Sequence, residues 1–135
     1  MTEMVSGAKI VFLSAMWCIC CSVYAEDEEC INLLNHEKEY HKEIPIKIDS
    51  TMTLVAMKVD CATKTVTFVK QLNITLYQLQ TGYQHRRQQK HLNVHCHNEG
   101  LPTVGWSAIE YVYEKNMQLL VRLEANPELC AHLLK

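Results

Sequence analysis

The chain has 135 residues, 48% of them hydrophobic, and a formal net charge of −2 at pH 7. This length allows one small domain, and the nearly neutral charge excludes the strong positive field that nucleic-acid-binding proteins use. Only four glycines are present, which argues against a glycine-rich phosphate-binding loop.

The N-terminal segment has the layout of a secretory signal peptide. Lys9 supplies a positive charge, the run from Ile10 to Val23 is mostly apolar, and acidic residues follow Ala25 directly. The pattern predicts cleavage after Ala25, with Met4 as an alternative start to Met1. A membrane anchor is the other interpretation, but the run is shorter than the roughly 20 residues that a span needs. No cysteine has the small preceding residue of a lipobox, so no lipid anchor is expected.

The expected export of the protein determines how we interpret its cysteines. Residues 26–135 are the expected single mature domain, and they keep four cysteines: Cys30, Cys61, Cys96 and Cys130. In an oxidising compartment, an even number predicts two disulfides, for which three pairings are open. Each would add about 2–4 kcal/mol to a domain with a small core. The predicted location is the periplasm or the extracellular medium.

The first half of the expected domain predicts a helix and then a hairpin. Acidic residues begin the polar segment Glu26 to Tyr40, and Pro45 follows its end. From Ile46 the chain leads into an extended segment, and the two predicted strands are residues 53–59 and 65–72, where β-branched and apolar residues are frequent. The turn between them contains Cys61.

The second half repeats this order. Residues 73–98 predict a helix, broken near Gly82, that packs one stripe of side chains on the sheet. In residues 106–124, apolar side chains recur at every second position on both sides of Lys115-Asn116, which predicts a hairpin with one buried face and a turn at Asn116. A short turn over residues 127–134 carries the last cysteine. The order α-ββ-α-ββ predicts an α+β domain, with a four-stranded antiparallel sheet from two β-hairpins and helices on one face.

The cluster that most resembles a metal site is His91, His95, Cys96 and His97. A helix would present the first two histidines to one ion, because they are four residues apart. However, no further ligand, CxxC motif or HExxH motif accompanies them, and Cys96 is expected in a disulfide. We therefore expect surface histidines and neither metal nor cofactor.

Catalytic motifs are also missing from the sequence. There is no GxSxG elbow, and an even number of exported cysteines leaves no free thiolate for a Cys–His pair. The pairs of neighbouring acidic residues lie in polar segments, so we interpret them as solvent-exposed charges. The prediction is a protein without enzymatic activity, with a small secreted hydrolase that uses a histidine as the alternative.

The strongest charge feature is the set His85, Arg86, Arg87, Lys90 and His91. It is either the solvent face of the helix or a contact surface for an acidic partner or for membrane headgroups. In the second case, protonation of the histidines below about pH 6 would strengthen binding. No aromatic residues alternate with these charges, so nucleic acid is not expected. Membrane contact beyond export is not expected either.

Two further features have alternative interpretations. Trp106, Tyr111 and Tyr113 are expected in the core, with an exposed binding stripe as the alternative. Asn73 begins an Asn-Ile-Thr glycosylation sequon, which matters only in a eukaryotic host.

Residues 45–130 resemble a known family of small exported domains. The relevant parts are IPIKIDSTMTLVAMKVD, TVTFVKQL, a helix ending at Cys96, Gly105-Trp106-Ser107, IEYVYEKNMQLLVRLE and Cys130. They resemble Gram-negative disulfide-containing domains such as the pilotin of Vibrio-type type II secretion systems. The resemblance implies an α+β fold, a Cys96–Cys130 bridge, a Cys30–Cys61 bridge, and a binding role without catalysis. The chain departs from pilotins in lacking a lipobox.

These observations predict an exported, non-enzymatic domain that binds another protein through its sheet edge or its basic helix. A pilotin-like or chaperone-like role in assembly or secretion is the first expectation. The alternatives are an immunity or inhibitor protein against an exported enzyme, and a secreted eukaryotic or viral lumenal factor.

Overall fold

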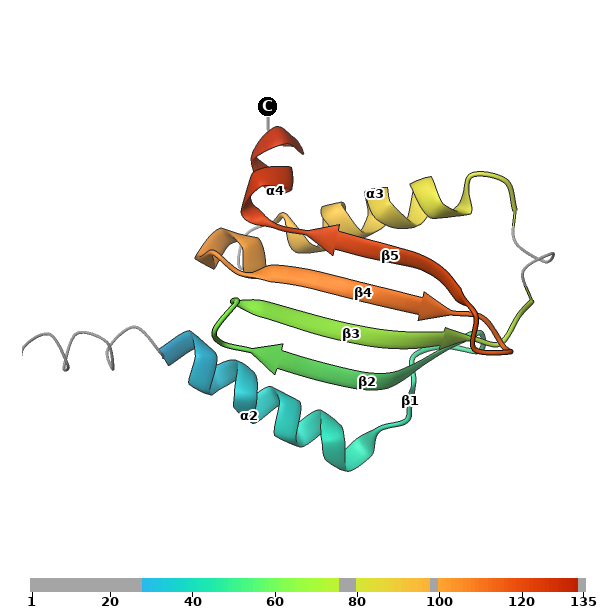
Figure 1. Ribbon diagram of the computed structural model, residues 1–135, viewed down its shortest axis with the longest axis horizontal. Coiled ribbons are helices and arrows are strands. Elements are labelled where there is room, and N and C mark those ends of the chain that lie inside the picture. The colour runs from blue at the N-terminus through green and yellow to red at the C-terminus, as the bar shows by residue number, and fades with distance from the viewer. Residues whose placement is uncertain (1–27, 76–79, 98–99, 134–135) are drawn as a thin grey trace, which may run out of the picture. The chain divides into compact units, whose positions relative to one another are not determined.

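The computed structural model describes residues 28–75, 80–97 and 100–133 (Figure 1). The described chain divides into two units between residues 33 and 34, and this boundary lies within a helix. The predicted signal peptide lies outside the described residues. Among the helices in those ranges, none has the length and apolar character needed to cross a membrane.

Three α-helices occur in the described ranges, and local sequence signals explain their ends. Acidic residues in its first turn favour the start of the first helix, and Pro45 follows its end closely. Gly82, with φ of 82°, precedes the second helix, which begins where the predicted helix over residues 73–98 was expected to break. Residues 73–75 and 80–82 are not helical, so that part of the prediction is wrong. Proline begins the third helix, where its missing N–H costs nothing. The bounds are α2 Glu28–Glu43, α3 Tyr83–His95 and α4 Pro127–Leu133, with a 3₁₀ helix η2 at Leu101–Val104.

In the described part of the chain, five strands form one mixed sheet in the order β1-β2-β3-β4-β5 (Figure 1). Their bounds are β1 Ile46–Lys47, β2 Met52–Asp60, β3 Thr65–Leu72, β4 Ser107–Tyr113 and β5 Leu119–Ala125. Both predicted hairpins are present, but the prediction of a four-stranded, all-antiparallel sheet is wrong. β3 and β4 are parallel, because the chain between them crosses over through α3 and returns in the same direction. The additional strand, β1, is the segment that was expected only to lead into β2.

The core lies on the face of the sheet that carries α3 and α4. One cluster joins four strands near the start of α3: Met52, Leu72, Val112, Val121 and Leu123, with Tyr83 packed against it. The other joins both helices to the sheet: Leu92, Cys96, Ala108, Ala125 and Cys130. Residues 34–43 of α2 lie along the edge of β2, where Glu37 and His41 contact its main chain.

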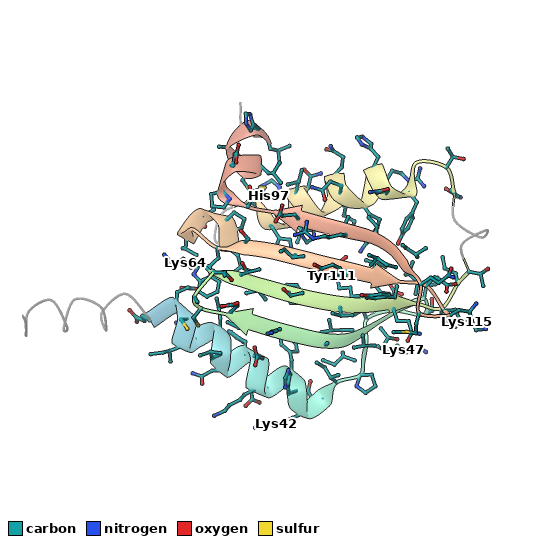
Figure 2. All side chains as sticks on the ribbon, viewed as in Figure 1. Lys42, Lys47, Lys64, His97, Tyr111 and Lys115 are labelled. Carbon is teal, nitrogen blue, oxygen red and sulfur yellow. A yellow bond between two sulfur atoms is a disulfide. The ribbon has the colours of Figure 1, made fainter. Side chains whose placement is uncertain are left out.

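The buried face of β4 is opposite to the predicted one. Its buried residues are Ala108, Glu110 and Val112. The aromatic side chains of Tyr111 and Tyr113 lie half-buried on the other face, and the Arg122 guanidinium lies 5.9 Å from the Tyr111 ring centroid. Tyr111 is labelled on β4 in Figure 2. The prediction that these tyrosines form the core is wrong, whereas Trp106 is buried as predicted.

The β4–β5 turn differs in detail from the expected one. The residue with positive φ is Met117, at 65°, and not Asn116. The buried carboxylate of Glu114 accepts hydrogen bonds from the N–H groups of Asn116 and Gln118, at 2.8 and 3.3 Å. A side chain thus stabilises the turn in place of the predicted asparagine conformation.

All four cysteines of the expected mature domain are disulfide-bonded, as their even number predicted. Cys96 at the end of α3 is bonded to Cys130 in α4, with Cα atoms 5.2 Å apart, which confirms the bridge that the family resemblance implied. Cys30 and Cys61 are each disulfide-bonded as well.

Candidate functional site

A groove lies between residues 34–43 of α2 and α3, on the core-bearing face of the sheet. It consists of two adjoining hollows of about 400 and 190 Å³. The hollows share the lining residues Ile48, Lys70, Val94, His95 and Glu110. We call this feature the interhelix groove.

The larger hollow is mainly apolar. Its further lining residues are Tyr40 of α2, Ile46 of β1, and Leu54 and Phe68 of β2 and β3. Three of the side chains around the groove are large, apolar and exposed: Tyr40 by 39%, Ile48 by 48% and Val94 by 62%. Exposed apolar side chains gathered at one concave place are typical of a surface that binds another molecule.

The floor of the groove carries a buried carboxylate between two cations. Glu110 Oε1 lies 2.5 Å from Lys70 Nζ, and its Oε2 lies 2.7 Å from an Arg87 guanidinium nitrogen. The carboxylate is 5% exposed, and the two cations about one-fifth. Burial alone would raise the pKa of Glu110, but the hydrogen bond and charge of Lys70, with the charge of Arg87, lower it below its usual value. Glu110 is therefore ionised at neutral pH.

Two histidines of α3 lie beside this carboxylate. His91 is buried, its Nε2 donates a hydrogen bond to the Ala108 carbonyl at 2.9 Å, and its ring centroid lies 4.5 Å from that of His95. Burial lowers the pKa of both, and that of His95 falls to about 4. The expectation of surface histidines is therefore wrong for His91. His95 would supply no positive charge at pH 6, and the lowered pKa of His91 works against the predicted acid-strengthened binding.

The free energy of unfolding should depend on pH because of the lowered histidine pKa values, and thermal or denaturant unfolding can measure this dependence. Between pH 6.5 and about 4 the unfolded chain binds a proton at His95 that the folded chain does not, so stability should fall as the pH falls. Because His95 is only half-buried, we expect a loss of about 1–2 kcal/mol after allowance for solvent screening. His95→Gln should remove this part of the loss, and Gln89→Ala, on the exposed side of the same helix, should not. Equal pH profiles for all three proteins would contradict the prediction.

The geometry does not favour metal binding or acid–base catalysis at this place. No group of three or more histidine, cysteine or acidic side chains within the described ranges is arranged to hold a metal ion. In the cluster singled out from the sequence, Cys96 is bonded to Cys130. A general base works best with a pKa near the working pH, and that of His95 is about 4.

The five basic residues of α3 do not form one surface. Arg87 and His91 face the sheet, and Lys90 lines the smaller hollow with them. His85 and Arg86 are exposed outside the groove, and Arg86 donates a hydrogen bond to the Thr81 carbonyl at 2.6 Å. No sequence motif pointed to Lys70, Phe68 or Val94 as site residues. The only signal for Glu110 was an acidic residue within an otherwise apolar strand.

Comparison with known proteins identifies the fold. No protein-family model and no curated protein sequence matches the chain. A candidate secreted protein from Pseudomonas aeruginosa is similar in structure, with a TM-score of 0.60 at 15% identity, over 78% of this chain and 96% of that one. The pilotin EpsS of the Vibrio vulnificus type 2 secretion system has a TM-score of 0.58 at 12% identity, over 78% and 96%. The type II secretion pilotin AspS of Vibrio cholerae has 0.54 at 17%, over 77% and 95%. The predicted resemblance to pilotins is thus confirmed for the fold.

Proposed function

We propose that this chain is an exported, non-enzymatic protein-binding domain with a pilotin-like role in secretion, and that its partner binds in the interhelix groove. The observation that carries the proposal is the gathering of Tyr40, Ile48 and Val94, all exposed, around one apolar hollow. Such side chains lose unfavourable contact with water when a partner covers them.

The lining of the groove suggests the chemistry of the partner segment. An amphipathic helix would place apolar side chains in the larger hollow, next to Leu54 and Phe68. Its polar side would then meet Lys90, which is exposed and lines the smaller hollow. Of the basic residues expected to bind a partner, Arg87, Lys90 and His91 remain in the proposed contact set, and His85 and Arg86 do not.

Two observations support the cellular role. The disulfides are typical of an oxidising compartment, which agrees with the predicted signal peptide and with a periplasmic or secreted location. The fold shared with two type II secretion pilotins makes a component of a secretion system the most direct class of partner.

Replacing Val94 by Asp should strongly weaken partner binding without disturbing the fold. Val94 is 62% exposed, so the change removes no core contact but places a charge in an apolar contact surface. Affinity capture of the mature protein from its native compartment should recover a partner that Val94→Asp loses. With that partner purified, calorimetry should show at least about a 30-fold weaker affinity, as expected at a central apolar contact.

The matched control is Val104→Asp, in η2 outside the groove lining, where the side chain is 53% exposed. It introduces the same charge at an equally apolar position and should leave the affinity within about twofold. A partner that both variants bind as tightly as the wild type would show that the groove is not the binding site.

A further inference from the structure

The edge of β2 is closed by side chains of a helix instead of by a full neighbouring strand. Among the residues that the structure describes, β1 pairs with β2 only at Thr53 and Leu54. Farther along the same edge, Glu37 Oε2 accepts a hydrogen bond from the Val59 N–H group. His41 Nε2 donates to the Met57 carbonyl at 3.0 Å. Both main-chain groups point away from β3, where an additional strand would otherwise pair.

The spacing of the two helix residues matches that of the strand. Four helix residues advance about 6 Å, and two strand residues advance about 6.6 Å. Glu37 and His41 are four apart, and Val59 and Met57 are two apart in the opposite direction. α2 therefore runs antiparallel to β2 at this place, with one acceptor and one donor in register with the edge.

The opposite edge of the sheet has a similar contact. Gln88 of α3 donates from Nε2 to the Glu124 carbonyl at 2.9 Å, and its Oε1 accepts from the Glu124 N–H at 3.2 Å. One amide side chain thus satisfies both outward main-chain groups of a β5 residue. Helix side chains occupy pairing positions at both edges, so the arrangement at β2 is not an isolated contact.

Uncovered strand edges carry a known hazard, because their free N–H and C=O groups pair with other strands. The β2 sequence is largely apolar, and its edge is held to residues 34–43 of α2 through side-chain hydrogen bonds, in the described part of the chain. Two copies of one edge can pair antiparallel around a two-fold axis, since each copy presents the same groups to the other.

We propose that Glu37 and His41 close the β2 edge against strand addition, and that a second copy of this chain pairs with β2 when the two side chains are removed. This role is separate from partner binding in the interhelix groove. It concerns the outward main-chain groups of Met57 and Val59, and neither residue lines the groove.

The test compares two double variants on α2. Glu37→Ala/His41→Ala removes the acceptor and the donor. Glu39→Ala/Lys42→Ala removes an ion pair of 3.1 Å whose side chains are 69–72% exposed, and Lys42 points away from the sheet in Figure 2. Amide hydrogen exchange by NMR should show Val59 protected in the wild type and the control, and exchanging about tenfold faster or more in Glu37→Ala/His41→Ala. Sedimentation should show a concentration-dependent dimer for this variant alone.

A conservative variant separates edge closure from general destabilisation. Glu37→Gln keeps a side-chain oxygen that can accept the Val59 N–H, so it should stay monomeric with Val59 protected. An unprotected Val59 amide in the wild type would overturn the proposal without the use of any variant. So would a folded Glu37→Ala/His41→Ala protein that remains monomeric at high concentration. Should that variant fail to fold, Glu37→Ala is judged by the same two measurements.

Discussion

Replacing Cys96 and Cys130 together by alanine is expected to lower the free energy of unfolding by about 3–4 kcal/mol. The bridge joins residues 34 apart in sequence. Closing a loop of this size lowers the conformational entropy of the unfolded chain by an amount equivalent to about 3–4 kcal/mol. Both sulfur atoms also lie in a buried cluster with Leu92, Ala108 and Ala125, so their loss removes packing as well. Denaturant unfolding under non-reducing conditions measures the change, since the remaining disulfide stays oxidised.

Leu133→Ala is a suitable control on the same C-terminal helix. Leu133 is 39% exposed, and its truncation should cost less than about 1 kcal/mol. If the double cysteine variant lost no more stability than this control, the bridge would not be a major source of stability. The small apolar core would then be sufficient by itself, contrary to what the length of the chain suggests.

Local signals in the sequence predicted much of the secondary structure. Pro45 and Gly82 set helix boundaries because proline and glycine restrict or permit particular backbone angles. The period-two alternation along β3 correctly placed Val66 and Leu72 on the buried face. This is the side of the sheet on which both core clusters lie. The resemblance to pilotins gave the Cys96–Cys130 pairing, which spacing alone left open among three possibilities.

Other features depend on contacts between distant segments and were missed. A β-bulge between Leu54 and Ala56 reverses the alternation along β2, so the residues that point to the core change parity within one strand. Parallel pairing of β3 with β4 results from the crossover through α3, which no periodicity records. The interhelix groove combines side chains from two helices and four strands, so no single stretch of the sequence could indicate it.

Glu110 shows most clearly why the buried face of β4 was predicted wrongly. A charged residue in an apolar strand normally marks the solvent side, and Tyr111 beside it normally marks the core. Here Lys70 on β3 and Arg87 on α3 neutralise the carboxylate, so burial is tolerated at 5% exposure. The partners are 40 and 23 residues away in sequence and come together only in the folded sheet.

Replacing Glu110 by Gln is therefore expected to lower the free energy of unfolding at pH 7 by about 2–4 kcal/mol. Removing one member of a buried ion group leaves the remaining charges poorly solvated, and here two cations would face each other across an amide. Glu124→Gln is the matched control, because it breaks an exposed ion pair with Arg122 at 3.4 Å and should cost less than about 1 kcal/mol.

The pH dependence of the difference in unfolding free energy between wild type and Glu110→Gln identifies the cause of that difference. The folded pKa of Glu110 lies below its ordinary value of 4.5, so its ion pairs stabilise the fold above pH 4.5 and lose this effect as the pH falls through the folded pKa. The unfolding free energies of wild type and variant should therefore differ by the full amount at pH 7 and converge below pH 4.5. The histidine effect, between pH 6.5 and about 4, should be present in both proteins. A difference that stayed constant down to pH 3 would assign the loss to packing instead of charge.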